Sequence, residues 1–390
     1  MKYFLAGGAV RDMLLGISPK DLDYVFSGSE EEFRSRNPEA EKLGGGPAYG
    51  FHKHEFTPLG KDIQSNLQER DFTINSFLLA DDGVVHMHPS ALADLKDGRI
   101  IPSAPDSLLR DPLRIFRGAR LFAEFPNFRL ELSTLKLMAE AAASPKFTKI
   151  AAERVGRELS KALAAPAPGN FLRALELGKS LGYWFQELVG ARDIPAGPPA
   201  YHNSDVLEHI ARIMDKAAEE LTTWLKKNPD CPQERREELA AITVWMALAH
   251  DLGKVATPKD ILPHHYQHEL RGVDAAFALA KRLKLSNRLR IAGALSARLH
   301  MKAGIYERLR PATRVDLLMD AHNKKLFIPL FLVAQADSGL PYLLEKAQQE
   351  LKAILAVKLP AKWKDRGSES GKHLREMRCA ALIRLNRSRS

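Results

Sequence analysis

The chain of 390 residues opens with a short apolar run, a glycine pair and a second apolar segment, YFLAGGAVRDMLLG at residues 3–16. This order is typical of a β-strand, a tight turn and a helix, because glycine tolerates turn conformations that other residues resist. Asp21-Leu22-Asp23 follows and opens the next β-like run. Side chains two apart in a strand point to the same side, so Asp21 and Asp23 are candidate ligands for one or two Mg²⁺ ions.

The pattern of apolar residues changes from strand-like to helical near residue 107. Up to about residue 100, short apolar runs alternate with turn residues, which predicts a small mixed sheet with a few helices. From Ser107 onward apolar residues recur at helical spacing almost throughout. The sequence therefore predicts an α+β chain, with a sheet-containing head and a mostly α-helical remainder. Proline- and glycine-rich breaks at residues 164–169 and 194–199 are the best candidate boundaries.

Charge and composition narrow the class of partner and compartment. The net charge is +10, and the last 34 residues hold ten Lys or Arg against three acids. This balance is compatible with a polyanionic partner, although a basic tail can also be simply solvated. No uncharged apolar run approaches the roughly 18 residues of a membrane span. Cys231 and Cys379 are too few for a disulfide framework, which favours a reducing, cytoplasmic location.

The glycine pair has a chemical interpretation as well. Gly7 and Gly8 would let backbone N–H groups approach phosphate oxygens closely, and Arg11 adds a cation. Each feature alone also fits ordinary turn chemistry, and Asp21 and Asp23 alone fit a polar strand edge.

Four short segments follow one another along the first hundred residues: GGAVRD (7–12), DLD (21–23), RDFTIN (70–75) and DLKDG (94–98). In this order they resemble the motifs of the class II tRNA nucleotidyltransferases, which comprise bacterial CCA-adding enzymes and their poly(A) polymerase relatives. The resemblance implies a polymerase-β-like nucleotidyltransferase head that uses ATP and CTP, with Asp21 and Asp23 as catalytic Mg²⁺ ligands and the Gly8 and Arg11 turn near the triphosphate.

The third motif implies further nucleotide contacts. By the same resemblance, Arg70, Asp71 and Asn75 contact the sugar and phosphates of the nucleotide or brace the site. Asp71 and Asn75 are four apart, so capping and closing a helix remains an alternative.

The segment LRDPLR at residues 109–114 begins the first strong helical pattern, with Asp111 expected as N-cap and Pro112 as first helical residue. Asp111 and Arg114 share a helix face. In the resembled family a Glu-Asp-x-x-Arg motif occupies this place, and its Asp and Arg pair with the Watson–Crick edge of CTP or ATP. Arg110 replaces the first acid of that motif here, so a carboxylate that would orient Arg114 is absent.

Two more segments bear on nucleotide choice. AAERVGREL at residues 151–159 resembles the last neck motif of the family, which implies that Arg154, Arg157 and Glu158 line or brace the nucleotide pocket. Only 46 residues separate Asp23 from Arg70. Relatives that add all three nucleotides usually carry a longer loop here, and those that add only the terminal A often have a shorter one. An A-adding enzyme or a poly(A) polymerase therefore remains an alternative.

The helical half carries a second set of metal-ligand residue types. His209, His250-Asp251 and Asp337 provide imidazoles and carboxylates that packed helices can bring together around divalent ions. With Leu252-Gly253-Lys254 after Asp251, they resemble the signature of HD phosphohydrolases. The resemblance implies phosphatase, 2′-nucleotidase and 2′,3′-cyclic phosphodiesterase activities with a divalent transition metal or Mg²⁺. His264, His265, His268 and His300 resemble the histidine-rich stretches of the family members that carry this signature.

Taken together, the sequence predicts a cytoplasmic tRNA nucleotidyltransferase that adds or repairs the 3′-terminal CCA of tRNA, with a second, hydrolytic site. An alternative of another class is an HD hydrolase with an inactive, RNA-binding head. No membrane partner is expected, and both monomer and dimer stay open. The expected domains are a head (1–105), a helical neck with the base template (106–165), a body or linker (166–200), an HD-like domain (201–345) and a basic tail (346–390).

Overall fold

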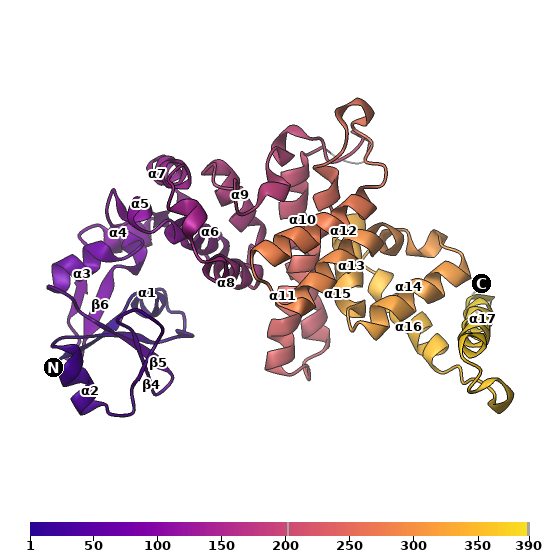
Figure 1. Cartoon of the computed structure of the whole chain (residues 1–390), viewed down its shortest axis with the longest axis horizontal. Helices are drawn as coiled ribbons and strands as arrows, with labels where there is room; N and C mark the ends of the chain where they lie inside the picture. The colour runs from indigo at the N-terminus through magenta and orange to yellow at the C-terminus, as the bar shows by residue number, and fades with distance from the viewer. Residues whose placement is uncertain (201–202, 388–390) are drawn as a thin grey trace. The chain divides into compact units, whose positions relative to one another are not determined.

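A computed structural model describes residues 1–200 and 203–387 of the chain. The chain divides into two compact units (Figure 1). The first contains Met1–Arg154 and Ala174–Ser180, and the second contains Val155–Arg173 and the chain from Leu181 onward. Helices α8 (Ala152–Leu163) and α9 (Gly169–Leu177) each contain residues of both units.

The first unit is built on a seven-stranded sheet with the strand order β3-β4-β5-β2-β1-β6-β7. Strands β2 and β5 run parallel, and the other neighbours are antiparallel, so the sheet is mixed. The strands are β1 (Tyr3–Ala6), β2 (Asp23–Phe26), β3 (Glu41–Lys42), β4 (Tyr49–Phe51), β5 (His54–Pro58), β6 (Phe77–Ala80) and β7 (Val85–Met87).

Alternation along the strands sends apolar side chains to both faces of this sheet. Phe4 and Ala6 of β1 join Leu67 in one buried cluster, whereas Leu5 packs against a second cluster that contains Val10 and Phe72. Helices therefore pack on both faces. The helices of this unit are α1 (Gly8–Leu14), α2 (Glu30–Arg36), α3 (Ile63–Glu69), α4 (Ala91–Lys96), α5 (Ser107–Arg110), α6 (Leu113–Glu124) and α7 (Leu132–Ala142), with the 3₁₀ helix η1 (Thr73–Asn75) and the short strands β8 (Arg99–Ile100) and β9 (Arg129–Leu130).

In its described part, the second unit is helical. Its central helix, α15, has an almost entirely apolar sequence from Phe327 to Ala336 and is buried along that length, because α10, α11 and α13 pack around it. The helices are α10 (Val206–Lys227), α11 (Gln233–Ala249), α12 (His268–Arg282), α13 (Asn287–Gly304), α14 (Pro311–Asn323), α15 (Phe327–Ser338), α16 (Leu343–Leu355) and α17 (Ser368–Arg387). The α+β prediction is confirmed.

A buried charged group joins the last helices. Glu350 of α16 is fully buried and accepts hydrogen bonds from the Tyr306 hydroxyl and from the Arg314 guanidinium of α14. Burial and the neighbouring carboxylate together raise the pKa of Tyr306, so this hydroxyl stays protonated and donates. The group fixes α14 and α16 to each other.

We expect Glu350→Ala to lower the free energy of unfolding by about 3–5 kcal/mol, because the Arg314 guanidinium would remain buried without its carboxylate. Chemical denaturation followed by tryptophan fluorescence measures this loss. Glu345→Ala, at an exposed position of the same helix, is the matched control and should shift stability by no more than about 0.5 kcal/mol. Equal effects of the two substitutions would contradict a structural role for the buried group.

Candidate functional site

The glycine turn lies between β1 and α1 of the first unit. Gly7 has a φ of 68°, a left-handed conformation that favours glycine, and its N–H donates to the Phe77 carbonyl at 3.0 Å. A Cβ atom at Gly7 would lie 3.0 Å from Nη1 of Arg70. The turn therefore brings the backbone close to a guanidinium, and any larger residue at position 7 would push Arg70 away.

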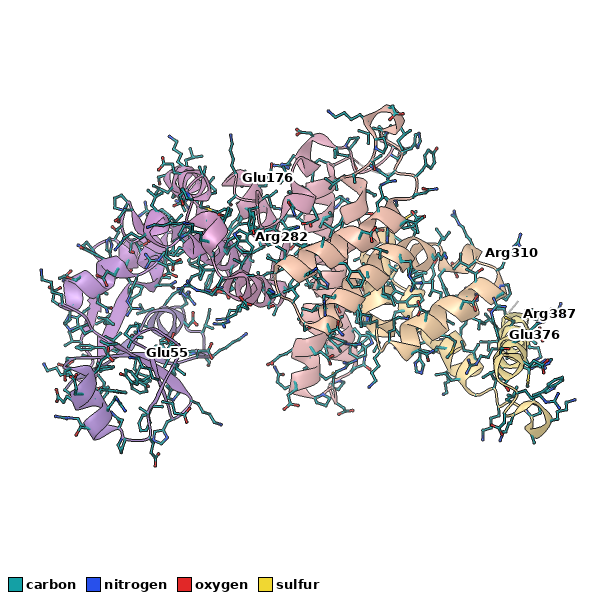
Figure 2. The ribbon with its side chains drawn as sticks, in the orientation of Figure 1. Glu55, Glu176, Arg282, Arg310, Glu376 and Arg387 are labelled. Carbon is teal, nitrogen blue, oxygen red and sulfur yellow. The ribbon has the colours of Figure 1, made fainter. Side chains whose placement is uncertain are left out.

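Three carboxylates lie near the start of β2. Asp21 precedes the strand and Asp23 is its first residue, and both are exposed. Asp23 is in register with Glu55 of the parallel strand β5, so the two side chains share one face of the sheet. Glu55 is labelled in Figure 2. Glu55 is a candidate functional residue that the sequence analysis missed, because its link to Asp23 exists only through strand pairing.

A chain of polar contacts joins α1 to the 3₁₀ helix η1. Arg11 is buried and its Nη1 donates to Oδ1 of Asn75 at 2.6 Å, while its Nε and Nη2 donate to Oδ1 of Asp12 at 2.9 and 2.7 Å. Nδ2 of Asn75 donates to Oδ1 of Asp71 at 3.1 Å. On the other side of Asp71, Nε of Arg117 from α6 lies 2.9 Å from Oδ2. The structure thus brings together three of the residues predicted to bind nucleotide.

The charges in this group are set by their neighbours. Burial lowers the pKa of Arg70 to about 10, and the carboxylates of Asp71 and Asp23 limit that change, so Arg70 remains a cation at neutral pH. Burial would raise the pKa of Asp71, but the Arg117 guanidinium and the hydrogen bond from Asn75 outweigh it and leave the pKa below its usual value. The electrostatic effect of Asp23 on Arg70 links this group to the exposed carboxylates.

The segment before α6 differs from the predicted cap. Pro112 is the N-cap and Leu113 the first helical residue, so the predicted N-cap at Asp111 is wrong by one position. Asp111 still serves the helix start, because its Oδ1 accepts from the Leu113 N–H at 3.1 Å. Its Oδ2 lies 3.3 Å from Nη2 of Arg154. The difference is small, because Asp111 is extended, with a φ of −134° and a ψ of 94°, whereas Pro112 already has helical angles, with a φ of −63° and a ψ of −10°.

Arg114 is held by groups other than a carboxylate. Its Nη1 donates to the carbonyl of Arg70 at 2.9 Å and to Oγ of Ser107 at 2.5 Å, and its Nη2 donates to the Glu69 carbonyl. The Ser107 hydroxyl is fully buried and donates in turn to the Asp71 carbonyl. A guanidinium has five N–H donors, so among the described residues these bonds leave Nε–H and one Nη2–H on the adjacent edge.

Three other residues singled out in the sequence lie on α5 (Arg110) and on α8 (Arg157 and Glu158). Arg110, which stands in place of the acid of the resembled motif, pairs with Asp106 across one helical turn, with Nε and Oδ2 3.1 Å apart. Arg157 is exposed on the part of α8 that belongs to the second unit, and Glu158 beside it is buried. Only residues 59–62 lie between β5 and α3. This connection is short, in agreement with the short spacing between Asp23 and Arg70 in the sequence.

The second candidate site lies in the helical unit, where five α-helices and one 3₁₀ helix converge. The side chains that meet there come from different places in the fold: His209 from α10, His250 at the C-terminal end of α11, Asp251 at the start of η5 (Leu252–Lys254), His268 at the start of α12, His300 from α13 and Asp337 near the end of α15. Helix packing thus brings all four of the ligand residues predicted here into one group.

The first half of this group contains the predicted residues. Nε2 of His209 lies 3.0 Å from Oδ2 of Asp251 and 3.4 Å from Oδ1 of Asp337. Nε2 of His250 lies 3.2 Å from the same Asp251 oxygen and 3.3 Å from Nε2 of His209. Two ligand atoms that each lie about 2.1 Å from the same cation are separated by about the distances seen here.

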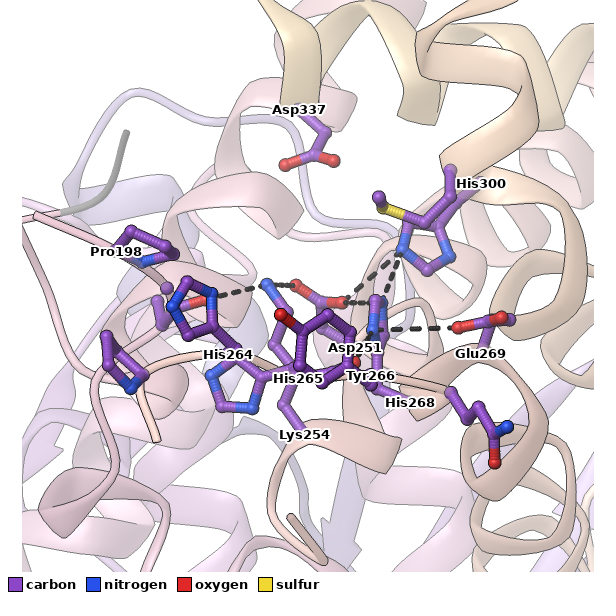
Figure 3. A pocket seen from close by; sticks show the side chains of 15 residues that line it. Pro198, Asp251, Lys254, His264, His265, Tyr266, His268, Glu269, His300 and Asp337 are labelled. Atoms are coloured by element: carbon purple, nitrogen blue, oxygen red, sulfur yellow. Dashed lines mark hydrogen bonds and ion pairs between the residues drawn. The ribbon is translucent and has the colours of Figure 1, made fainter. Parts of the chain in front are cut away.

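The second half shares Asp251. Its Oδ1 lies 3.2 Å from Nε2 of His268 and 3.4 Å from Nε2 of His300, and these two nitrogens are 3.2 Å apart (Figure 3). His209, His250 and Asp251 form one set with metal-ligand geometry, and Asp251, His268 and His300 form a second. His268 and His300 had no predicted role as ligands, because their convergence depends on the packing of α12 against α13.

Two further observations fit a bound cation. Oδ1 of Asp251 is buried without a hydrogen-bond donor among the described residues. Nδ1 of His250, His268 and His300 each lies 2.6 to 3.0 Å from a backbone carbonyl, so Nδ1–H can donate there and leave a lone pair on Nε2. The residues present therefore fit one or two divalent ions, with Asp251 as the shared ligand.

Electrostatic coupling within the group is strong. Burial would lower the pKa of His209, but the carboxylates of Asp251 and Asp337 raise it overall. Burial would raise the pKa of Asp251, yet the charges of Lys254 and His250 hold it well below its usual value. Nζ of Lys254 lies 2.7 Å from Oδ2 of Asp251 and donates to the Ala196 carbonyl at 2.8 Å. Asp251 is therefore a carboxylate in the folded chain.

Gly253 allows the close approach of the backbone that carries Asp251 to the start of α12, which carries His268. Gly253 of η5 packs directly on the start of α12, so that an added Cβ atom would overlap the His268 carbonyl oxygen and lie 2.5 Å from the Gly272 backbone nitrogen. These are backbone atoms, which cannot move aside as a flexible side chain can. The absence of a side chain at position 253 thus lets Asp251 and His268 approach each other.

A cavity of about 390 Å³ opens onto this group and includes Asp251, Lys254, His268, His300 and Asp337 in its lining. That volume falls within the roughly 300–1,000 Å³ typical of small-ligand pockets. Among the described residues, every helix is too short or too polar to cross a lipid bilayer.

Comparisons with known proteins show which proteins this chain resembles. Residues 3–42 match the family described as Poly A polymerase head domain. Two curated relatives named Multifunctional CCA protein, from Pasteurella multocida and Alkalilimnicola ehrlichii, are each 31% identical, and each alignment covers 87% of this chain and 84% of the relative. Among solved structures, the Thermotoga maritima CCA-adding enzyme complexed with tRNA matches with a TM-score of 0.66 and 18% identity over 100% of this chain and 92% of that one. A CCA-adding enzyme complexed with ATP matches with a TM-score of 0.67 and 19% identity over 98% and 86%.

Proposed function

Because the chain belongs to the family of the multifunctional CCA proteins, we propose that it is a tRNA nucleotidyltransferase that adds or repairs the 3′-terminal CCA of tRNA from CTP and ATP. The observation that carries this proposal is the 31% identity to such a protein over 87% of the chain. The resemblance inferred from four short motifs is confirmed by these relatives. Polymerisation by a chain of this family needs no nucleic-acid template, so the protein itself must choose the base.

The proposed reaction takes place at the exposed carboxylates of β2. The 3′-hydroxyl of tRNA gives its proton to solvent as its oxygen bonds to the α-phosphorus of the nucleotide. The bond from that phosphorus to the α,β-bridging oxygen breaks, and this oxygen leaves as part of pyrophosphate. Asp21 and Asp23, with Glu55 as a third candidate, would hold Mg²⁺, which supplies charge stabilisation for the attacking and leaving oxygens. The Gly8 turn, Arg11 and Arg70 would bind the triphosphate. Asn75 and Asp71 would keep Arg11 in place through their hydrogen bonds.

Base choice is proposed to rest on Asp111 and Arg114. The two donors left on Arg114 suit acceptors such as N3 and O2 of cytosine or N1 of adenine, and an Asp111 oxygen can accept from the exocyclic amine of either base. Uracil and guanine present an N–H where Arg114 needs an acceptor. The carbonyls of Glu69 and Arg70 and the Ser107 hydroxyl would orient Arg114 in place of the absent acid. Arg154, whose Nη2 lies 3.3 Å from Oδ2 of Asp111, completes the proposed pocket lining. The nucleotide-binding role of Arg157 stays a prediction.

We expect Ser107→Ala to reduce selectivity, because Arg114 would lose one of three bonds that fix its guanidinium. A hydrogen bond to a charged group contributes about 1.5 kcal/mol or more, so kcat/KM for CTP should fall about tenfold. Measuring kcat/KM for CTP, ATP, UTP and GTP tests this. Ser76→Ala removes another fully buried hydroxyl, which bonds only the Phe72 carbonyl among the described residues, and should leave selectivity unchanged. Unaltered discrimination in Ser107→Ala would rule out the positioning role.

The nucleotides added can be read directly. A tRNA that ends at the discriminator base is incubated with CTP alone, ATP alone or both, and its 3′ ends are sequenced. We expect two C residues with CTP alone and the full CCA with both nucleotides. Incorporation of A only would favour an A-adding enzyme, and a long A tract would favour a poly(A) polymerase. No incorporation at all would leave the hydrolase with an RNA-binding head as the remaining function.

We propose a second activity for the helical unit, on the specific ground that the side chains of His209, His250, His268, His300 and Asp337 converge with that of Asp251. His209, His250, Asp251 and Asp337 would hold one divalent ion, and Asp251 would share a second with His268 and His300. Bound cations of this kind, a transition metal or Mg²⁺, would supply Lewis acidity for phosphoester hydrolysis. The substrates we propose are 2′,3′-cyclic phosphates, 2′-phosphates and other phosphate monoesters. Lys254 would balance the charge of Asp251 and tie it to the Ala196 backbone.

The wider setting follows from these activities. We propose tRNA as the macromolecular partner, bound through its phosphates, so that binding weakens as salt concentration rises. We also propose a cytoplasmic location and a division of labour into a head (1–105), a neck with the base template (106–165), a body (166–200), a hydrolase domain (201–345) and a basic tail (346–390). Monomer and dimer are both compatible with this proposal.

A further inference from the structure

Two exposed aromatic rings lie at the rim of the cavity that opens onto Asp251. Tyr266 is 66% exposed, and its ring lies nearly parallel to that of the exposed His264, with the ring centroids 5.7 Å apart and an interplanar angle of 13°. Both residues line the same cavity as Asp251, His268 and His300 (Figure 3). A large aromatic ring is thus held in solvent beside the candidate metal centre.

The residue between the two rings anchors them. His265 is buried, its Nε2 lies 2.8 Å from the Pro195 carbonyl and its Nδ1 lies 2.8 Å from Oγ1 of Thr257. On the other side of Tyr266, Gln267 adopts a φ of 60°, a left-handed conformation uncommon for a residue other than glycine. The next residue, His268, belongs to the metal-facing group. The loop therefore holds Tyr266 at a fixed place two residues from a candidate ligand.

We propose that Tyr266, backed by His264, is the stacking surface for the nucleobase of the molecule that the helical unit hydrolyses. This inference rests on the hydrolytic function proposed above and adds the residues that decide its specificity. Single exposed aromatic side chains are common and need no function. This one differs because it has a parallel ring beside it, a buried anchor in its own loop and a place on the cavity rim. Flat bases stack on such rings without regard to sequence.

The proposal predicts a preference for nucleotides over phosphate esters that lack a base. A free nucleotide and the last residue of an RNA both offer this base, because both carry the same ring next to the same phosphate. Tyr266 would contact the base and leave the chemistry to the group around Asp251. Its loss should therefore raise KM and spare kcat.

The test compares Tyr266→Ala with Tyr266→Phe, which keeps the ring, and with Tyr183→Ala, which removes another exposed tyrosine outside the cavity lining. The substrates are guanosine 2′-monophosphate, a short RNA ending in a 2′,3′-cyclic phosphate, and glycerol 2-phosphate, which has no base. Guanine is chosen because the proposed nucleotide pocket of the head would reject it. All measurements use the full chain with a fixed concentration of Mn²⁺.

We expect Tyr266→Ala to raise KM for the guanosine nucleotide by about 5- to 100-fold, with less than twofold change for glycerol 2-phosphate. Tyr266→Phe and Tyr183→Ala should behave like the unaltered chain. An increase confined to the RNA substrate would also support the stacking surface and identify a polynucleotide end as its occupant. Equal losses on glycerol 2-phosphate, or no change on either base-containing substrate, would overturn the proposal.

Failure of the hydrolytic function can be separated from failure of the stacking surface. If the unaltered chain hydrolyses none of the three substrates, the hydrolase proposal is wrong. Equilibrium binding of guanosine 2′-monophosphate then tests the proposed stacking surface by itself. Binding that is at least fivefold weaker in Tyr266→Ala supports the stacking surface, and identical binding in the two proteins rejects it.

Discussion

Replacing Asp21 and Asp23 together by asparagine is expected to reduce nucleotide incorporation into tRNA by on the order of a thousandfold or more. Asparagine has nearly the same size but no charge, so the head keeps its shape and loses two anionic oxygen ligands. Charge stabilisation by a bound metal contributes several kcal/mol to phosphoryl transfer, and each 1.36 kcal/mol corresponds to a factor of ten in rate. Single-turnover incorporation of labelled CMP and AMP measures the loss.

The control for this change lies in the same unit. Asp81 is exposed in the turn between β6 and β7, and Asp81→Asn removes a charge of the same kind away from β2. It should leave incorporation within about twofold of the unaltered chain, as surface substitutions usually do. Retained incorporation in the double variant would show that the metal ligands of the head are other residues. Hydrolytic activity of the double variant, expected to be normal, verifies that the chain is folded.

The second large effect is expected at Asp251. Asp251→Asn should abolish hydrolysis of a 2′,3′-cyclic phosphate while CCA addition continues, because the shared carboxylate of both metal-ligand sets is removed. The rate should fall by on the order of a thousandfold or more. Hydrolysis of an RNA ending in a cyclic phosphate gives the rate, and metal analysis of the purified chain shows whether bound cation is lost with it.

A complication at Asp251 is the buried Lys254, which would keep its charge without a carboxylate beside it. Loss of such a partner can destabilise a protein by about 3–5 kcal/mol. Asp337→Asn avoids this problem, because its carboxylate has no lysine or arginine partner among the described residues and lies at the partly exposed end of α15. It should also suppress hydrolysis. Full cyclic phosphodiesterase activity in Asp337→Asn, together with normal metal content, would contradict the proposed ligand set.

Features that depend on close spacing along the chain could be predicted from the sequence. Asp21 and Asp23 are two apart, and Gly7 stands directly between an apolar run and a helix, where the structure has a left-handed turn. The change from strand-like to helical patterning near Ser107 likewise predicted the α+β fold. In each of these cases the local pattern carries the physical requirement.

Residues whose role depends on tertiary packing could not be predicted from the sequence. Glu55 joins Asp23 only through the parallel pairing of β2 and β5. Ser107 holds Arg114 across the gap between α5 and α6, and hydroxyls of this kind occur throughout the chain. His268 and His300 meet at Asp251 because α12 and α13 pack side by side. No spacing in the sequence encodes these approaches.

The glycine at position 253 has a consequence for how related chains are interpreted. A single base change can convert a glycine codon to an alanine codon, and the new methyl group would separate Asp251 from His268 without altering any ligand. Such a chain would keep every histidine and aspartate of the hydrolytic signature and still be inactive. A surviving signature is therefore insufficient grounds for assigning repair capacity to a genome, and the residue two positions after Asp251 should be inspected first.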